Sequence, residues 1–254
     1  MSEKSLVAQK VPDEILHLEM ELKGIAHEYF ASMQRVQGHK RMMNDLEEKH
    51  GLLSKYPLVK GLMNGSHRTL MRLHKSIRRI MERKLREHPI YHEFFEKIPG
   101  AGPVVACFLL GMAPARKFPN ISKLWKYVGL APKNKYTAYK SFNIKVAWAL
   151  HNAFEGFLRA GPNNNFYARY YYYWREKIEE ELRKKAEQGT LKIRPTKRFI
   201  HLLTAKKVKR MFTGHYWEFY RKYFGLPVVE PYFVMIGLKH LYIPPEQALE
   251  SMEL

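Results

Sequence analysis

Cysteine is almost absent from this sequence of 254 residues, which holds a single one at position 107. One cysteine excludes an internal disulfide framework and a cysteine-rich zinc site. Cys107 lies in the apolar run from Val104 to Leu110, so we expect a buried structural thiol. The 12 histidines show no HExxH or similar metal spacing, and the chain has no Walker loop and no dinucleotide-binding unit. We therefore expect no metal site and no cofactor.

Long uncharged apolar runs are also missing. No stretch approaches the roughly 20 residues that a membrane span needs. The first residues lack the apolar core of a signal peptide. These absences favour a cytoplasmic protein without a membrane partner. The chain is nevertheless 46% hydrophobic, which is enough for a real core in one large domain or two small ones.

Acidic residues are missing from two windows of the chain. Residues 97–154 hold nine Lys or Arg and residues 188–217 hold eight, with no Asp or Glu in either window. Together the windows supply 17 of the 20 net positive charges. A field of this sign attracts polyanions, and the lack of carboxylates indicates phosphate as the ligand. We therefore expect a nucleic-acid partner, and double-stranded DNA is the first candidate. A metal nuclease is disfavoured, because it needs several convergent carboxylates.

The spacing of apolar residues is helical along most of the chain, and strand signals are few. Residues 13–50 carry a stripe with alternating spacings of three and four, interrupted by the polar Ser32. We expect a break over 51–65 and then a second stripe, which comprises Leu70, Leu73, Ile77 and Ile80. Two such stripes predict an antiparallel coiled-coil hairpin, or arms that join two copies of the chain.

Pro89 follows the second stripe and marks a predicted domain boundary. We predict an all-α fold with a coiled-coil arm over 1–88 and a helical DNA-binding domain over 89–254. Further helices are expected over 90–97, within 118–130, and over 143–159, 166–187 and 197–223. The proline-rich C-terminal part is expected to be an irregular tail that packs back on the domain.

Residues 98–106 have the pattern of a helix-hairpin-helix element: an apolar residue, Pro, Gly, any residue, Gly, and then a small, apolar helix. Two glycines permit a tight turn and a close approach to another backbone. Pro103 suits the first turn of a helix, where free N–H groups bind a phosphate oxygen. The alternative is an ordinary connection without a ligand. The residues predicted to contact phosphate here are Pro99, Gly100 and Gly102.

Cations in the two windows complete the predicted interface. Six of them lie on the helix expected over 197–223, where they alternate with apolar residues and no acid lies among them. Exposed helix faces usually mix both signs of charge, so this face is unusual for a merely solvated surface. The cations predicted to contact phosphate are Lys117, Lys123, Lys126, Lys133, Lys135, Lys140, Lys145, Arg194, Lys197, Arg198, Lys206, Lys207, Lys209 and Arg210.

Aromatic residues crowd the window 166–174, which contains four consecutive tyrosines followed by Trp174. Aromatic rings can stack on exposed bases. Four consecutive residues of a helix point in all directions, so these rings cannot all serve one surface. We expect the window to supply mainly core and amphipathic rim, with base stacking as the alternative.

Two motifs together resemble a known family. The sequence Ile98-Pro-Gly-Ala-Gly-Pro-Val-Val-Ala106 is followed by Phe118 and then by Leu124-Trp-Lys-Tyr-Val-Gly-Leu-Ala-Pro132. This pairing is similar to the C-terminal transposase domain of the IS-one-ten class of insertion-sequence transposases, the bridge-type recombinases. The likeness covers about residues 90–245, with further stretches similar to archaeal members, and the N-terminal helices resemble the coiled coil that precedes this domain.

The resemblance implies a DNA-binding protein of a mobile genetic element. Family members carry an N-terminal RuvC-like domain with a catalytic acidic tetrad. This chain starts at the coiled coil, so we expect it to lack that domain and to have no independent strand-cleaving activity. A third function left open by the sequence is that of an RNA-binding or architectural protein that assembles through its coiled coil.

Ser141 carries the enzymatic alternative. The family uses a serine in the loop after the Gly-Leu-x-Pro motif, usually followed by glycine, and here Phe142 follows the only serine of that loop. An active recombinase or transposase would use Ser141 as its nucleophile, with an activating group that the sequence does not name. The structural interpretation is a helix-capping serine before Asn143.

Overall fold

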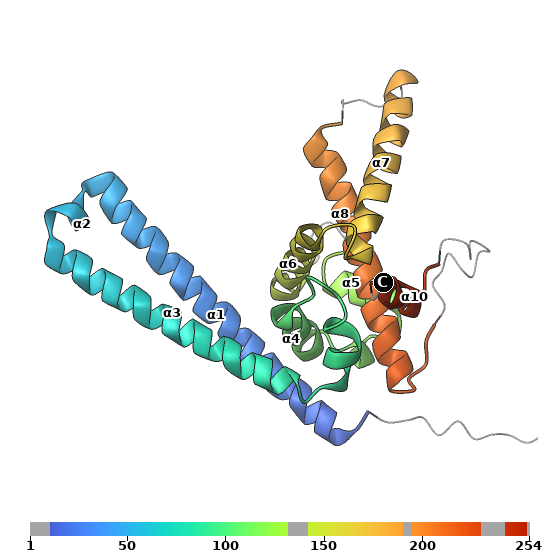
Figure 1. Ribbon diagram of the computed structural model, residues 1–254, viewed down its shortest axis with the longest axis horizontal. Coiled ribbons are helices and arrows are strands. Elements are labelled where there is room, and N and C mark those ends of the chain that lie inside the picture. Colours follow the sequence, from blue (N-terminus) through green and yellow to red (C-terminus); the bar gives the residue numbers. More distant parts are fainter. Residues whose placement is uncertain (1–10, 132–141, 190–194, 230–241, 253–254) are drawn as a thin grey trace, which may run out of the picture.

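Residues 11–131, 142–189, 195–229 and 242–252 are described by the computed structural model, and every element in these ranges is helical. The predicted all-α class is therefore confirmed. Figure 1 shows a long arm of N-terminal helices, a shorter limb made by α7 (Phe166–Glu187) and α8 (Lys197–Tyr223), and a small helical body where the two meet. The molecule thus has the outline of a V.

The arm consists of α1 (Asp13–His50), the short α2 (Leu52–Lys55) and α3 (Pro57–Leu85), with α1 and α3 antiparallel and side by side (Figure 1). The predicted bounds of the first helix are confirmed. Gly51 ends α1 in the left-handed conformation, with a φ of 60°. The predicted break over 51–65 is too long, because Pro57 fits the first position of a helix, where its missing N–H is not needed.

Leu73 and Ile80, two of the four residues in the predicted stripe of α3, do not face α1. Their side chains are exposed, at 46% and 44%. Leu70 and Ile77 are partly buried, so they follow the prediction. The stripe that meets α1 continues through histidines instead, and the exposed Leu73 and Ile80 remain compatible with the alternative, arms that join two copies of the chain.

His67 and His74 are the histidines on that stripe. The ring of His74 lies 4.5 Å from the ring of Tyr29, and its Nδ1 lies 2.9 Å from the hydroxyl oxygen of Ser32. The ring of His67 lies 5.6 Å from the ring of His39. Ser32, the polar interruption in the apolar stripe of α1, therefore faces a polar partner.

The body contains the π-helix η1 (Tyr91–Phe95), α4 (Pro103–Met112), η2 (Ala115–Lys117), α5 (Ile121–Tyr127), α6 (Ile144–Ala160) and α10 (Pro245–Glu250). The helices predicted over 143–159, 166–187 and 197–223 match α6, α7 and α8 within one residue. The helix predicted over 90–97 is a shorter π-helix. The C-terminal segment packs back on α8, as expected, but it does so through the helix α10, so its predicted irregular structure is wrong at Pro245–Glu250.

Four helices of the body and limb begin with a side-chain cap. Asn120, Asn143, Asn165 and Thr196 accept backbone N–H groups from the first turns of α5, α6, α7 and α8. The cap of α6 is therefore Asn143, and the capping role considered for Ser141 stays a prediction. Ser141 itself lies outside the described residues.

α4 is the centre of the hydrophobic core, and every residue after its first two is buried. The base of α1 crosses it so closely that a Cβ on Gly111 would lie 2.5 Å from the backbone nitrogen of Lys23. Cys107 is buried, as predicted, and its Sγ donates to the Leu22 carbonyl oxygen at 3.4 Å. Arm and body thus share one core, while the division into two domains after residue 88 remains a prediction.

A buried carboxylate ties the arm to the limb. Glu19 of α1 is 1% exposed and accepts hydrogen bonds from Arg116 Nε at 2.6 Å and from the Tyr220 hydroxyl at 2.5 Å. Burial raises the pKa of Glu19, and its two partners oppose that rise. Because Arg116 belongs to η2 and Tyr220 to α8, this one side chain joins three elements.

His215 is buried where α8 packs against α7. Its Nε2 lies 2.9 Å from the carbonyl oxygen of Ile243, which can only accept, so Nε2 carries the proton and Nδ1 accepts from the Tyr167 hydroxyl at 2.9 Å. Burial lowers the pKa of His215 to about 4. The same cause lowers the pKa of His88 to about 4. Both imidazoles are therefore neutral in the folded protein at neutral pH.

Replacing Gly111 with alanine should destabilise the protein, because the new Cβ meets the backbone of α1. Overpacking of this kind costs about 1–3 kcal/mol, and we expect a loss of that size in the free energy of unfolding measured with denaturant. Gly38→Ala is the matched control, since nothing lies within 4 Å of its added Cβ and alanine favours a helix. Equal stability of the two variants would contradict the crossing of α1 over α4.

Acidification should destabilise the protein through its buried histidines. Their pKa values are lowered by folding, so the unfolded chain binds more protons between pH 6.5 and about 4, and stability falls as the pH falls through that window. The expected loss between pH 7 and pH 5 is about 2 kcal/mol for each histidine. His215→Gln should show a shallower fall in unfolding free energy than the unchanged protein, and identical pH profiles would exclude a buried, neutral His215.

Candidate nucleic-acid interface

The first turns of the five α-helices from α4 to α8 contain no carboxylate. α4, α5, α6, α7 and α8 all begin without an acidic residue, whereas α1 begins with two. α8 even places Lys197 and Arg198 in its first turn, where the helix dipole disfavours cations. A helix start that combines free N–H groups with two cations attracts an anion such as phosphate.

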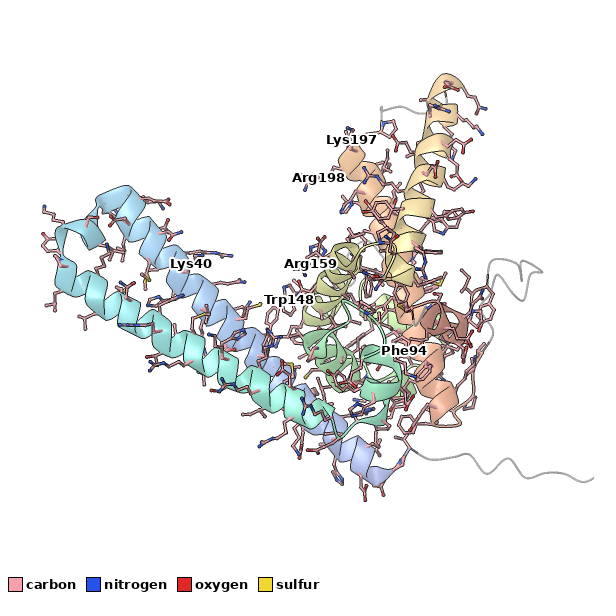
Figure 2. The ribbon with its side chains drawn as sticks, viewed as in Figure 1. Lys40, Phe94, Trp148, Arg159, Lys197 and Arg198 are labelled. Carbon is pink, nitrogen blue, oxygen red and sulfur yellow. The ribbon has the colours of Figure 1, made fainter. Side chains whose placement is uncertain are left out.

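Several cations border the opening of the V. In Figure 2, Lys40 projects from α1 on the side of the opening, and Arg159 of α6, Lys197 and Arg198 lie across from it. All four side chains are exposed. Sequence reasoning identified Lys197 and Arg198 but missed the other two. Lys40 lies on an ordinary mixed-charge helix face, and Arg159 lies just beyond the first acid-free window.

Lys145 lies deeper, between α6 and α1. Its Nζ is 2.6 Å from Nδ1 of His27 and 5.6 Å from the centroid of the Phe30 ring. Burial and the charge of Lys145 lower the pKa of His27, so the neutral imidazole accepts a hydrogen bond from the ammonium. Trp148, one turn further along α6, packs edge-on against Phe30 and joins α6 to the arm (Figure 2).

The predicted cations in the middle of α8 have partners within the protein. Lys206 Nζ and Arg210 Nε donate to the carbonyl oxygens of residues 131 and 130, at 3.2 and 2.7 Å. Lys207 Nζ lies 3.7 Å from the centroid of the Trp174 ring. These side chains therefore help to hold the fold while they supply positive charge. Burial lowers the pKa of three of them: Lys207, Lys209 and Arg210.

The predicted hairpin at 98–102 is held by packing. A Cβ on Gly100, whose φ is 95°, would lie 2.5 Å from the carbonyl carbon of Gly156 on α6. Asn165 Nδ2 donates to the Pro99 carbonyl oxygen at 2.6 Å. These contacts explain Gly100 without any ligand. Pro99, Gly100 and Gly102 are nevertheless exposed, at the turn that leads into α4.

The remaining predicted residues do not form one cluster. Lys123 and Lys126 are exposed on α5. Lys117 lies at the base of the arm, where the charges of Arg116 and Lys23 act on it and burial lowers its pKa. The other predicted residues lie outside the described ranges: Lys133, Lys135, Lys140, Ser141 and Arg194.

A cavity of about 590 Å³ opens between α5, α7 and α8. Tyr167 and Tyr171 of the aromatic window are buried, as expected for core. Other rings of that window face the cavity together with two tryptophans from distant parts of the chain, and no local sequence signal links these residues. The aromatic residues that line it are Trp125, Tyr170, Tyr173, Trp174, Trp217 and Tyr242.

A smaller cavity of about 320 Å³ lies on α7 and has the wrong charge for phosphate, since it is lined by Glu176, Glu179, Glu180 and Arg183. Among the described residues, no three His, Cys, Asp or Glu side chains gather as a metal site requires. In the same ranges, no helix combines the length and the apolar character needed to cross a membrane.

Residues 92–150 match the model of the transposase IS116/IS110/IS902 family. Comparisons with curated proteins and with solved structures give no match. The matched segment runs from η1 through α4 and α5 into α6, so it contains the exposed turn at 98–102. The resemblance inferred from the two sequence motifs is thereby confirmed, and residues 92–150 are similar to a transposase domain of the IS116/IS110/IS902 family.

Proposed function

We propose that this transposase-like protein of a mobile genetic element binds double-stranded DNA through its phosphates. One observation carries the proposal. Apart from its first five residues, the transposase match at 92–150 lies inside the acid-free window 97–154. The segment that resembles a transposase is thus also the segment without carboxylates, and phosphate is the ligand that both facts favour.

The opening of the V is the place proposed for the duplex. Lys40 borders it on the arm, and Arg159, Lys197 and Arg198 border it on the other side (Figure 2). α1 has 38 residues and is therefore about 57 Å long. A duplex carries one charge for about every 1.7 Å of its axis, so both sides can meet several phosphates. Such contacts position DNA without reading its sequence.

We also propose a phosphate contact at the exposed turn 98–102, in the manner of a helix-hairpin-helix element. α4 starts directly after this turn and has no acid in its first turn. Gly102 lacks a side chain and is exposed, so a phosphate can approach the free N–H groups of the helix start. This contact adds to the cations of the V.

An active recombinase that uses Ser141 is the second candidate function, and the position of that serine inside the matched segment favours it. The nucleophile would need a neighbouring base or a cation that lowers its pKa. Loss of strand exchange in Ser141→Ala, with DNA binding intact, is the result that distinguishes this enzyme from a protein that only binds.

The exposed side of α3 carries a further stripe of residues, and we propose that two copies of the chain associate through it. Residues 59, 62, 66, 69, 73, 76 and 80 of α3 are spaced by three and four and are all exposed. Four of them are apolar, and helix faces with this spacing pack against another helix. A second copy of the arm is the proposed partner of the apolar members, Val59, Leu62, Leu73 and Ile80.

Replacing Lys197 and Arg198 together with glutamine should weaken binding to duplexes of any sequence and lower the slope of log affinity against log salt by about 1 for each side chain. Fluorescence anisotropy at several salt concentrations measures both. The matched control is Arg183→Gln with Lys184→Gln, which removes the same charge from cations that are paired with Glu187 and Glu180.

Equal losses in the two double variants would contradict a specific role for the start of α8. Binding that does not respond to salt would contradict phosphate recognition altogether. Tighter binding of a structured RNA than of duplex DNA in direct competition would favour the RNA-binding alternative.

Leu73→Glu should shift the protein from an oligomer toward a monomer, because it places a charge in the proposed helix contact. Size-exclusion chromatography with light scattering measures the mass. Leu58→Glu is the matched control, since Leu58 is 79% exposed and lies outside the stripe. A monomeric unchanged protein, or an equal effect of both substitutions, would count against self-association through this stripe.

A further inference from the structure

The cavity between α5, α7 and α8 has two aromatic walls. Trp125 stands on the α5 side, with its orientation fixed by a hydrogen bond from Nε1 to the Thr213 hydroxyl at 3.0 Å. Tyr170, Tyr173 and Trp174 stand on the α7 side. Flat apolar faces therefore lie on both sides of the space.

A cation lies close to the Trp125 ring and another lies close to the Trp174 ring. Lys207 Nζ lies 3.7 Å from the centroid of the Trp174 ring, and the Arg210 guanidinium lies 5.6 Å from that of Trp125. Both cations come from α8 and line the cavity. Lys207 covers one face of the Trp174 ring, so a ligand must displace it or stack on the opposite face, and in either case it meets a positive charge.

Among the described residues that line the cavity, the one carboxylate, Glu218, already has partners. Lys222 Nζ lies 2.6 Å from one of its oxygens, and the Tyr242 hydroxyl donates to it. Since Lys222 balances its charge, Lys207 and Arg210 leave the cavity with a positive balance. A cationic ligand is disfavoured, and an anionic or phosphate-bearing ligand is favoured.

The floor of the cavity is open at Gly214 of α8. Nothing lies within 4 Å of a Cβ placed on this residue. The cavity of about 590 Å³ falls within the range of about 300–1,000 Å³ that holds small organic ligands, which is the size class of a single nucleotide. The cavity thus combines the volume for a nucleotide, aromatic side chains that line it, and the positive charges of Lys207 and Arg210.

From this arrangement we infer that the cavity binds one unpaired nucleobase of a nucleic acid, stacked on Trp125 or Trp174, with its phosphate at Lys207 or Arg210. Every base has a flat face for stacking, so this site accepts a base without reading its identity. A paired base cannot enter, because its faces are covered within the duplex. The inference rests on the proposed nucleic-acid binding and adds a preference for strands that contain an unpaired nucleotide.

A pair of otherwise identical short duplexes tests the inference, one fully paired and one with a single extra nucleotide that bulges out and carries 2-aminopurine. The unchanged protein should bind the bulged duplex about tenfold more tightly, a factor within the range that stacking of one base on an aromatic side chain supplies. The 2-aminopurine fluorescence should fall when its base stacks on an indole ring.

Gly214→Leu should abolish both effects, because its side chain fills the cavity from the floor. The Cβ of this substitution meets no atom within 4 Å, and leucine favours the helix more than glycine does, so we expect the protein to keep its fold. Trp174→Ala should act in the same direction by removing one wall. Tyr172→Ala is the matched control, since Tyr172 is an exposed ring of the same helix that does not line the cavity, and it should retain the preference.

Equal affinity of the unchanged protein for both duplexes would overturn the inference, as would a preference that survives Gly214→Leu. Failure of the proposed function looks different: the paired duplex would then not bind at all. Quenching of 2-aminopurine without any binding of the paired duplex would reject duplex recognition and support the cavity.

Discussion

The crossing of α1 over α4 is the contact on which the rest of the structure depends. A glycine at position 111 lets the backbones meet, and the Leu22 carbonyl accepts the thiol of Cys107 at the same place. Glu19, one turn away, then joins α1 to η2 and α8 through two hydrogen bonds. Because these contacts lie at the base of the arm, they set the direction of the whole arm relative to the limb and so define the V in Figure 1.

Charge is distributed in this V against the usual preferences of helices. Carboxylates stabilise helix starts, yet five successive helices of the body and limb have none there. α8 instead begins with Lys197 and Arg198, which its dipole disfavours. An anion that binds at the start of α8 would offset this unfavourable interaction between the cations and the helix dipole. Cations of the acid-free windows thus lie at helix starts and around one cavity. The net charge of the chain alone does not reveal this placement.

Long helices were predictable because their periodicity and their caps agree. α1, α7 and α8 have the predicted bounds, and their starts or ends carry residues such as Gly51 and Thr196. The arm contact was predicted only in part, since His67 and His74 occupy positions that an apolar pattern passes over. The cavity was not predictable, because Trp125 and Trp174 come together only through the packing of α5 and α7 on α8. Lys40 and Arg159 join the interface for the same reason: tertiary packing, not local sequence, places them on the V.

The central claim is that the two sides of the V hold DNA by its phosphates. Hydrogen–deuterium exchange with and without a duplex tests it most directly, because the first N–H groups of a helix have no partner within the helix and exchange readily unless a ligand covers them. Binding of the duplex in the V should slow exchange at the start of α8 and in the parts of α1 and α6 around Lys40 and Arg159. Unchanged exchange in these segments while DNA is bound would contradict it.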